Sequence, residues 1–212
     1  MVVYLRELYY PAGFAFPLAS MSEEIYVTEV LREVATIVML VSISAAVGRS
    51  YYERLAYFLM NFAIWDIFYY IFLKLLLGWP ATLLDWDILF LIPITWIGPV
   101  LAPVLCSLVM LWMTALILRF EDAGKLLPFN RMEWGGILGG SIIIFGTFIR
   151  DYVVMVSLSG LLLSPKSAQA LAMFQRLSAV YIPQTYAWGW FGLGLVLTVL
   201  AVVRWAARND KS

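Results

Sequence analysis

Six charged residues stand inside long apolar stretches of this sequence and form its predicted charge cluster. They are Glu29, Arg32, Glu33, Asp66, Arg150 and Asp151. An ionised side chain at bilayer depth is costly, so such residues commonly pair with one another or mark the path of an ion or proton. Acidic residues outnumber basic ones in this set, which favours a cation or a proton over an anion as a ligand.

Arg150 needs an acidic partner, because an unpaired arginine at this depth costs at least about 2.5–3.5 kcal/mol. The adjacent Asp151 points about 100° away on a helix and is poorly placed to satisfy the whole guanidinium group. We therefore predict a pair between Arg150 and Asp66, with Glu33 as the second choice. Such a pair either pins the helices together or belongs to a ligand or ion site, and the sequence leaves both interpretations open.

The sequence excludes several classes of chemistry. It has no histidine and one cysteine, Cys106, which excludes His-ligated haem, most zinc and copper sites, and Ser-His-Asp or Cys-His catalysis. No phosphate-binding loop, dinucleotide fingerprint or hydrolase motif occurs. We predict that the chain is not an enzyme and has no catalytic, cofactor-binding or metal-binding residues. Its zero net charge and lack of a basic block exclude nucleic acid as a partner.

The composition predicts an all-α membrane protein. Of the 212 residues, 63% are hydrophobic and 13% are charged, whereas a soluble domain has about 25% charged residues. Five segments are long and apolar enough to cross a bilayer. We place them at residues 27–48, 53–78, 88–118, 134–160 and 185–205, and predict a bundle of about five transmembrane helices.

The third apolar segment is too long for one straight span and is rich in helix-breaking residues. It contains Pro93, Gly98, Pro99 and Pro103, and proline removes a helix hydrogen bond and clashes with the preceding turn. We predict a proline-broken third helix, with residues 86–96 interfacial or re-entrant and residues 98–118 crossing the membrane. The break either shapes the helix or lines a site.

Three regions follow along the chain. Residues 1–26 are predicted to be an interfacial N-terminal segment, residues 27–208 the five-span bundle, and residues 209–212 a cytoplasmic tail. Ser164 and Pro165 are typical of a helix start and predict a short surface helix that ends near Val180. A capping box from Asn130 to Glu133 predicts the start of the fourth span.

Basic residues predict the orientation. One set of loops and ends holds Arg49, Arg54, Arg119, Lys125, Arg131, Arg204, Arg208 and Lys211, and the opposite set holds Arg6, Lys166 and Arg176. Because short cytoplasmic loops carry the excess of lysine and arginine, we predict an outer N-terminus and a cytoplasmic C-terminus in a bacterial-type inner membrane.

Four glycines at the start of the fourth span form a candidate packing face. Gly135, Gly136, Gly139 and Gly140 make two overlapping pairs with a spacing of four, and small residues at this spacing let helices approach closely. The face either packs inside the bundle or meets a second copy or another subunit.

Small size, an odd number of spans and the lack of a catalytic motif favour a non-catalytic subunit or assembly partner of a larger membrane complex. The alternative is a small transporter or channel component whose acidic and arginine residues bind a cation or proton in the outer half of the membrane. The expected partners are the lipid bilayer and other membrane subunits or a second copy.

Overall fold

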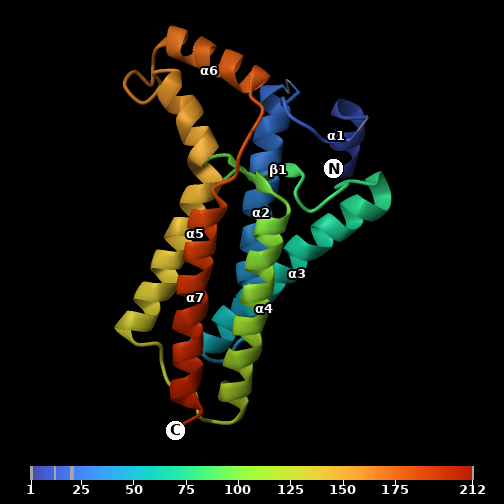
Figure 1. Cartoon of the computed structure of the whole chain (residues 1–212). Coiled ribbons are helices and arrows are strands. Elements are labelled where there is room, and N and C mark those ends of the chain that lie inside the picture. The colour runs from blue at the N-terminus through green and yellow to red at the C-terminus, as the bar shows by residue number, and fades with distance from the viewer. Residues whose placement is uncertain (1, 12, 20–21, 212) are drawn as a thin grey trace. The chain divides into compact units, whose positions relative to one another are not determined.

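The computed structural model describes residues 2–11, 13–19 and 22–211 and is mostly helical (Figure 1). The described residues form seven helices and one two-stranded sheet. The helices are α1 Val2–Tyr9, α2 Glu23–Val47, α3 Tyr51–Leu77, α4 Leu101–Asp122, α5 Arg131–Leu158, α6 Ala168–Val180 and α7 Trp188–Asn209, and the strands are β1 Trp86–Phe90 and β2 Trp96–Pro99.

Five of these helices, α2, α3, α4, α5 and α7, are long and apolar enough to cross a membrane. This agrees with the five apolar segments of the sequence. The helix boundaries differ from those predicted by a few residues. For example, α2 begins at Glu23 and not at residue 27, and α7 continues through Asn209 and not only to residue 205. Asn209 is fully buried, so the last turn of α7 belongs to a packed core.

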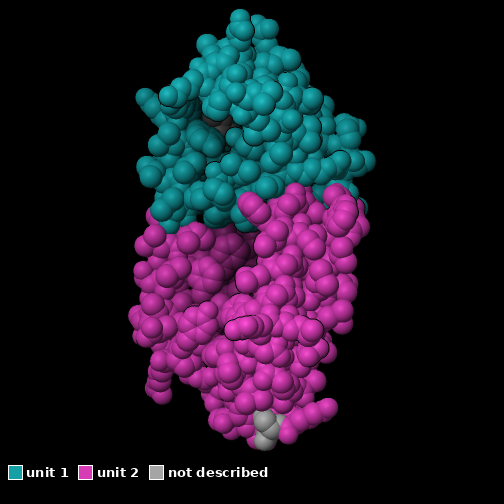
Figure 2. Space-filling view, turned by 90° about the vertical axis from the view of Figure 1, so that its left-hand side faces the viewer, with its two compact units in different colours: residues 1–34, 70–101, 148–186 teal, residues 35–69, 102–147, 187–212 magenta. Residues whose placement is uncertain are grey.

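The chain divides into two compact units (Figure 2). Unit 1 comprises residues 1–34, 70–101 and 148–186, and unit 2 comprises residues 35–69, 102–147 and 187–212. The helices α2, α3 and α5 each contribute one part to unit 1 and another to unit 2. Each unit is therefore built from segments that lie far apart in the sequence.

Unit 2 packs α5 directly against α7. A Cβ atom added at Gly136 would lie 2.7 Å from the Ala201 side chain, and one added at Gly140 would collide with Thr198 and with the Gly194 carbonyl. In contrast, nothing lies within 4 Å of a Cβ atom added at Gly135 or Gly139. Two glycines of the candidate packing face thus contact α7, and the other two face away from it.

Unit 1 contains an antiparallel hairpin in which Trp86 pairs with Pro99 and Asp87 with Gly98. Close packing explains the glycine, because a Cβ atom at Gly98 would lie 3.1 Å from Leu89 and 3.3 Å from Phe148. This hairpin corrects the predicted proline-broken third helix, since α4 runs without interruption from Leu101.

The four residues of the predicted helix break have other positions. Pro93 lies between the two strands, Gly98 and Pro99 belong to β2, and Pro103 occupies the first turn of α4. The first-turn amides of a helix have no intrahelical acceptor, so proline there breaks no hydrogen bond. The four residues therefore do not form one helix break: three belong to the hairpin and one to the start of a continuous helix.

The helix starts show one confirmation and one correction. Asn130 Oδ1 accepts from the backbone N–H of Glu133 at 2.9 Å, and Glu133 Oε2 accepts from the Asn130 N–H at 2.8 Å, which confirms the capping box. The predicted start at Ser164 is wrong by one turn. Ser167 is the N-cap of α6, and its hydroxyl oxygen accepts from the Ala170 N–H at 3.3 Å.

Candidate functional site

The predicted charge cluster is divided between the two units. Asp66 belongs to unit 2, and the other five residues belong to unit 1. Within unit 2, Asp66 Oδ2 accepts a 2.8 Å hydrogen bond from the Ser107 hydroxyl, which links α3 to α4. The pairing of Arg150 with Asp66 stays a prediction.

Three members of the cluster lie on the first half of α2. Arg32 Nε donates to Glu29 Oε2 at 2.8 Å, and Glu29 Oε1 is buried with no hydrogen-bond partner among the described residues. Glu33 is buried, and its Oε2 accepts from the backbone N–H of Leu91 at 2.9 Å. Since Leu91 directly follows β1, this bond ties α2 to the hairpin.

Arg150 and Asp151, on the last part of α5, both bind the segment that follows α6. The guanidinium group of Arg150 donates to the Thr185 carbonyl at 3.3 Å. Asp151 accepts from the Tyr181 hydroxyl, and burial together with this carboxylate raises the pKa of Tyr181 above its usual value. These two contacts hold residues 181–185 against α5 within unit 1.

A second buried ion pair in unit 1 joins Arg6 of α1 to Asp87 of β1. The Arg6 guanidinium lies 2.6 Å from Asp87 Oδ1, and Asp87 is fully buried. Arg6 Cζ also lies 4.4 Å from the centre of the Phe14 ring and 4.3 Å from that of Trp79. Both distances are within the range of cation–π attraction, so the guanidinium group has ionic and aromatic neighbours.

Burial raises the pKa of the Asp87 carboxyl group, while the charge of Arg6 and hydrogen bonds from Arg6, the Ile88 N–H and Tyr70 oppose this shift. This pair is not visible in the sequence. Arg6 and Asp87 are 81 residues apart, and no local pattern connects them. The inward-facing position of Asp87 in the strand Trp86–Phe90 is the signal that could have drawn attention to it.

A cavity of about 250 Å³ lies beside this ion pair in unit 1. Its lining is aromatic and charged, and comprises Arg6, Glu7, Tyr10, Pro11, Gly13, Phe14, Leu77 and Trp79. Burial raises the pKa of Tyr10, and its hydroxyl oxygen accepts from the Ala19 N–H at 2.7 Å. The walls of the cavity are made by α1, the loop after it, the end of α3 and Trp79.

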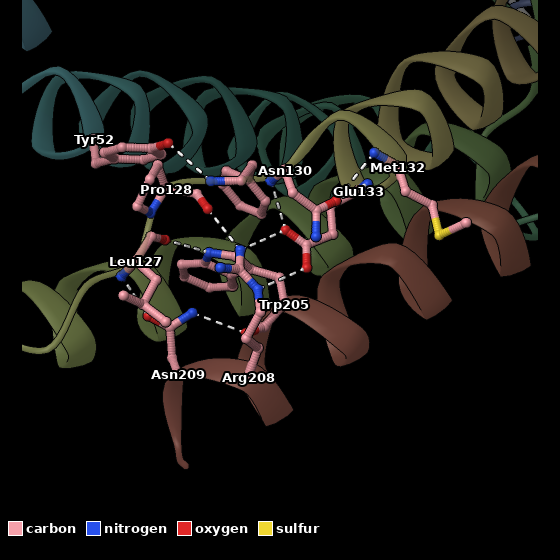
Figure 3. A network of polar contacts seen from close by, with 10 residues as sticks. Tyr52, Leu127, Pro128, Asn130, Met132, Glu133, Trp205, Arg208 and Asn209 are labelled. Atoms are coloured by element: carbon pink, nitrogen blue, oxygen red, sulfur yellow. Dashed lines mark hydrogen bonds and ion pairs between the residues drawn. The ribbon is translucent and has the colours of Figure 1, made fainter. Parts of the chain in front are cut away.

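Unit 2 has a polar network of a different kind, centred on Glu133 and Arg208 (Figure 3). Glu133 is fully buried. Arg208 Nε donates to Glu133 Oε1 at 3.1 Å, and its terminal amino group donates to Glu133 Oε2 at 2.8 Å and to the Pro128 carbonyl at 2.6 Å. This two-pronged geometry is the strong form of an arginine–carboxylate pair.

The same network holds the loop between α4 and α5 to the end of α7. The Trp205 indole N–H donates to the Leu127 carbonyl at 2.8 Å, and Asn209 Oδ1 accepts from the Leu127 N–H at 2.6 Å. The Tyr52 hydroxyl accepts from the Phe129 N–H at 3.0 Å. Because chain groups satisfy these polar atoms, the network serves to fasten the loop.

Among the described residues, no group of three or more Asp, Glu or Cys side chains is arranged to hold a metal ion. The chain matches no known family profile, and comparisons with curated proteins and with solved structures find no match.

Proposed function

We propose that this chain is a non-catalytic multi-pass protein of a bacterial-type inner membrane and acts as a subunit or assembly partner of a larger membrane complex. The observation that supports an assembly role is the face of α5 that points away from α7. Gly135, Gly139 and Gly146 have open space where a Cβ atom would lie, and Ile142 between them is 68% exposed. At 100° per residue these four positions fall within about 60° of one another.

This open glycine face, made by Gly135, Gly139, Ile142 and Gly146, suits contact with another membrane helix. Small residues allow backbones to approach, and close packing drives helix association where lipid removes the hydrophobic force between helices. The opposite glycines, Gly136 and Gly140, already contact α7. The helix thus has one internal and one external small-residue face, and the external one is available to a partner.

The test is the native mass of the protein extracted in mild detergent, compared between two glycine variants. Gly139→Leu fills the open glycine face, whereas Gly192→Leu fills an equally open position on α7. We expect the wild type and Gly192→Leu to retain the partner or second copy, and Gly139→Leu to lose it. A wild-type mass equal to that of the 24.1 kDa monomer, or an intact complex in Gly139→Leu, contradicts the proposal.

A second candidate function is a cation or proton site at the start of α2. It is supported by the buried Glu29 Oε1, which has no hydrogen-bond partner among the described residues, and by the buried Glu33 four residues later. We expect Glu33→Gln to abolish proton flux into liposomes that contain the protein, and the exposed Glu24→Gln to leave it unchanged. Equal flux in the two variants, or none in the wild type, argues against this function.

The proposed orientation has an outer N-terminus and a cytoplasmic C-terminus, as the basic residues predict. Lys74 binds the carbonyls of Gly78 and Pro80 beyond α3, so we count it with the basic residues of the outer side. The cytoplasmic side then has eight basic residues and the outer side has four. Single cysteines at Ser50 and Ser164, in a Cys106→Ala background, are expected to react from opposite sides of sealed vesicles. Reaction from the same side contradicts the orientation.

A further inference from the structure

The cavity of unit 1 has an unequal distribution of charge. The positive charge of Arg6 is already balanced by Asp87 at 2.6 Å. Glu7 also lines the cavity, is exposed, and takes part in no ion pair among the described residues. Counted together, Arg6, Asp87 and Glu7 leave one negative charge, and it lies on Glu7, the charged group of the lining that can face a cationic ligand.

The aromatic lining strengthens this preference for a cation. Tyr10, Phe14 and Trp79 form part of the wall, and the faces of such rings attract organic ammonium groups as well as arginine. Phe14 and Trp79 each contact one cation, the Arg6 guanidinium group, and the Tyr10 ring also belongs to the wall. A carboxylate beside aromatic rings is the chemistry that recognises an ammonium group.

The cavity is small, and exposed leucines adjoin its lining residues in the sequence. Drug-sized ligands occupy about 300–1,000 Å³, so a cavity of about 250 Å³ has room for a small polar group only. Leu75 and Leu76, which precede Leu77 of the lining, are 73% and 62% exposed, and Leu8 of α1 is 56% exposed. A ligand with a small cationic head and an apolar tail matches both features.

We propose that this cavity binds the ammonium headgroup of a zwitterionic phospholipid, with Glu7 facing the ammonium group and the acyl chains lying along the exposed leucines. The inference rests on the membrane location proposed above and is independent of the assembly role. Phosphatidylethanolamine is the appropriate probe, because its headgroup is small and ends in an ammonium group. Phosphatidylglycerol with the same acyl chains is the matched lipid, because it lacks that group and has a net negative charge.

The experiment measures the affinity of the delipidated protein for each lipid in detergent, by titration of its thermal stability. We expect the wild type to bind phosphatidylethanolamine about five- to tenfold more tightly than phosphatidylglycerol, as an interfacial ion pair with an aromatic contribution suggests. Glu7→Gln is expected to reduce this ratio to about one. Glu24→Gln, at an exposed acid on α2 outside the cavity, is expected to keep it.

Equal binding of the two lipids by the wild type overturns the inference, as does an unchanged ratio in Glu7→Gln. Soluble phosphoethanolamine supplies the same headgroup without acyl chains. We expect it to compete only at far higher concentration, and equal competition overturns the assignment to a lipid. Complete release of the protein from membranes by alkaline carbonate contradicts the membrane location itself, so the two failures are distinguishable.

Discussion

Glu133 of unit 2 and Asp87 of unit 1 are both fully buried carboxylates that face an arginine. Glu133 meets Arg208 through both oxygens and also caps α5 through Asn130, in a network that fastens a loop. Asp87 meets Arg6 beside two aromatic rings and a cavity. The buried ion pair of unit 2 thus holds a loop of the chain in place. The buried ion pair of unit 1 instead lies beside a cavity that is also lined by Glu7.

Glu29 of unit 1 also differs from Glu133, whose two oxygens both accept hydrogen bonds. One of its oxygens binds Arg32, while the other is buried and has no hydrogen-bond partner among the described residues. A buried polar atom without a partner costs free energy, so a fold tends to retain it where it serves a ligand or a proton. Unit 1 is therefore the part of the chain whose buried polar groups suit a ligand or a proton.

The largest expected effect is at the ion pair of unit 1. Arg6→Leu leaves the Asp87 charge buried and unpaired, and we expect a loss of about 3–5 kcal/mol in the free energy of unfolding. The double variant Arg6→Leu/Asp87→Leu should lose less, because no lone charge remains. Thermal unfolding in detergent is the measurement.

The control for this prediction is Arg119→Leu. Arg119 and Asp210 are 3.7 Å apart and mostly exposed, so we expect a loss below about 1 kcal/mol. A comparable loss at Arg6 and Arg119 would show that burial does not distinguish the two pairs.

The same substitution at two glutamates compares the units directly. Glu133→Gln replaces an acceptor of Arg208 or Asn130 with an amide donor, and we expect a loss of about 2–3 kcal/mol. Glu29→Gln keeps one oxygen for Arg32 and changes an oxygen that has no hydrogen-bond partner in the described part of the chain, so we expect a change within about 0.5 kcal/mol. Chemical unfolding curves of both variants give the comparison, and equal losses would mean that Glu29 is as fully satisfied as Glu133.

Glycine contacts on α5 sharpen the description of unit 2. Gly140→Leu pushes a side chain into Thr198 and the Gly194 carbonyl, and we expect a loss of about 1–3 kcal/mol from overpacking. Gly135→Leu enters open space and gains helix propensity, so its stability should be unchanged or up to about 1 kcal/mol higher. A loss of stability at both positions would show that both faces of α5 are packed against other groups.

The smallest expected effect is on the pH dependence of stability. The folded state raises the pKa of Asp87 above the ordinary value of 3.8, so in the window above 3.8 the folded protein keeps a proton that the unfolded chain has released. The contribution of Asp87 to stability therefore falls as the pH rises through this window. We expect the stability of the wild type relative to Asp87→Asn to decrease from pH 3.8 upward, and a relative increase would mean that Arg6 outweighs burial.

Much of the fold follows from local sequence patterns. The five apolar segments, the Asn130–Glu133 capping box and the surface helix before residue 180 all depend on composition or on spacings of a few residues. The hairpin at residues 86–99 could not be predicted from local patterns. Proline and glycine, as at Pro93, Gly98 and Pro99, occur both where a helix is broken and where two strands are joined. The antiparallel pairing of β1 with β2 is what distinguishes these alternatives.

By itself, the sequence determined the number of long apolar helices, because five separate segments are each long and apolar enough to cross a membrane. It also identified which charges are unusual, since a charged residue within an apolar run is visible locally. Only the tertiary structure decided how charges are paired. Arg6 and Asp87 are 81 residues apart and Glu133 and Arg208 are 75 apart, and such pairs form only where the chain returns on itself, which periodicity along one helix does not encode.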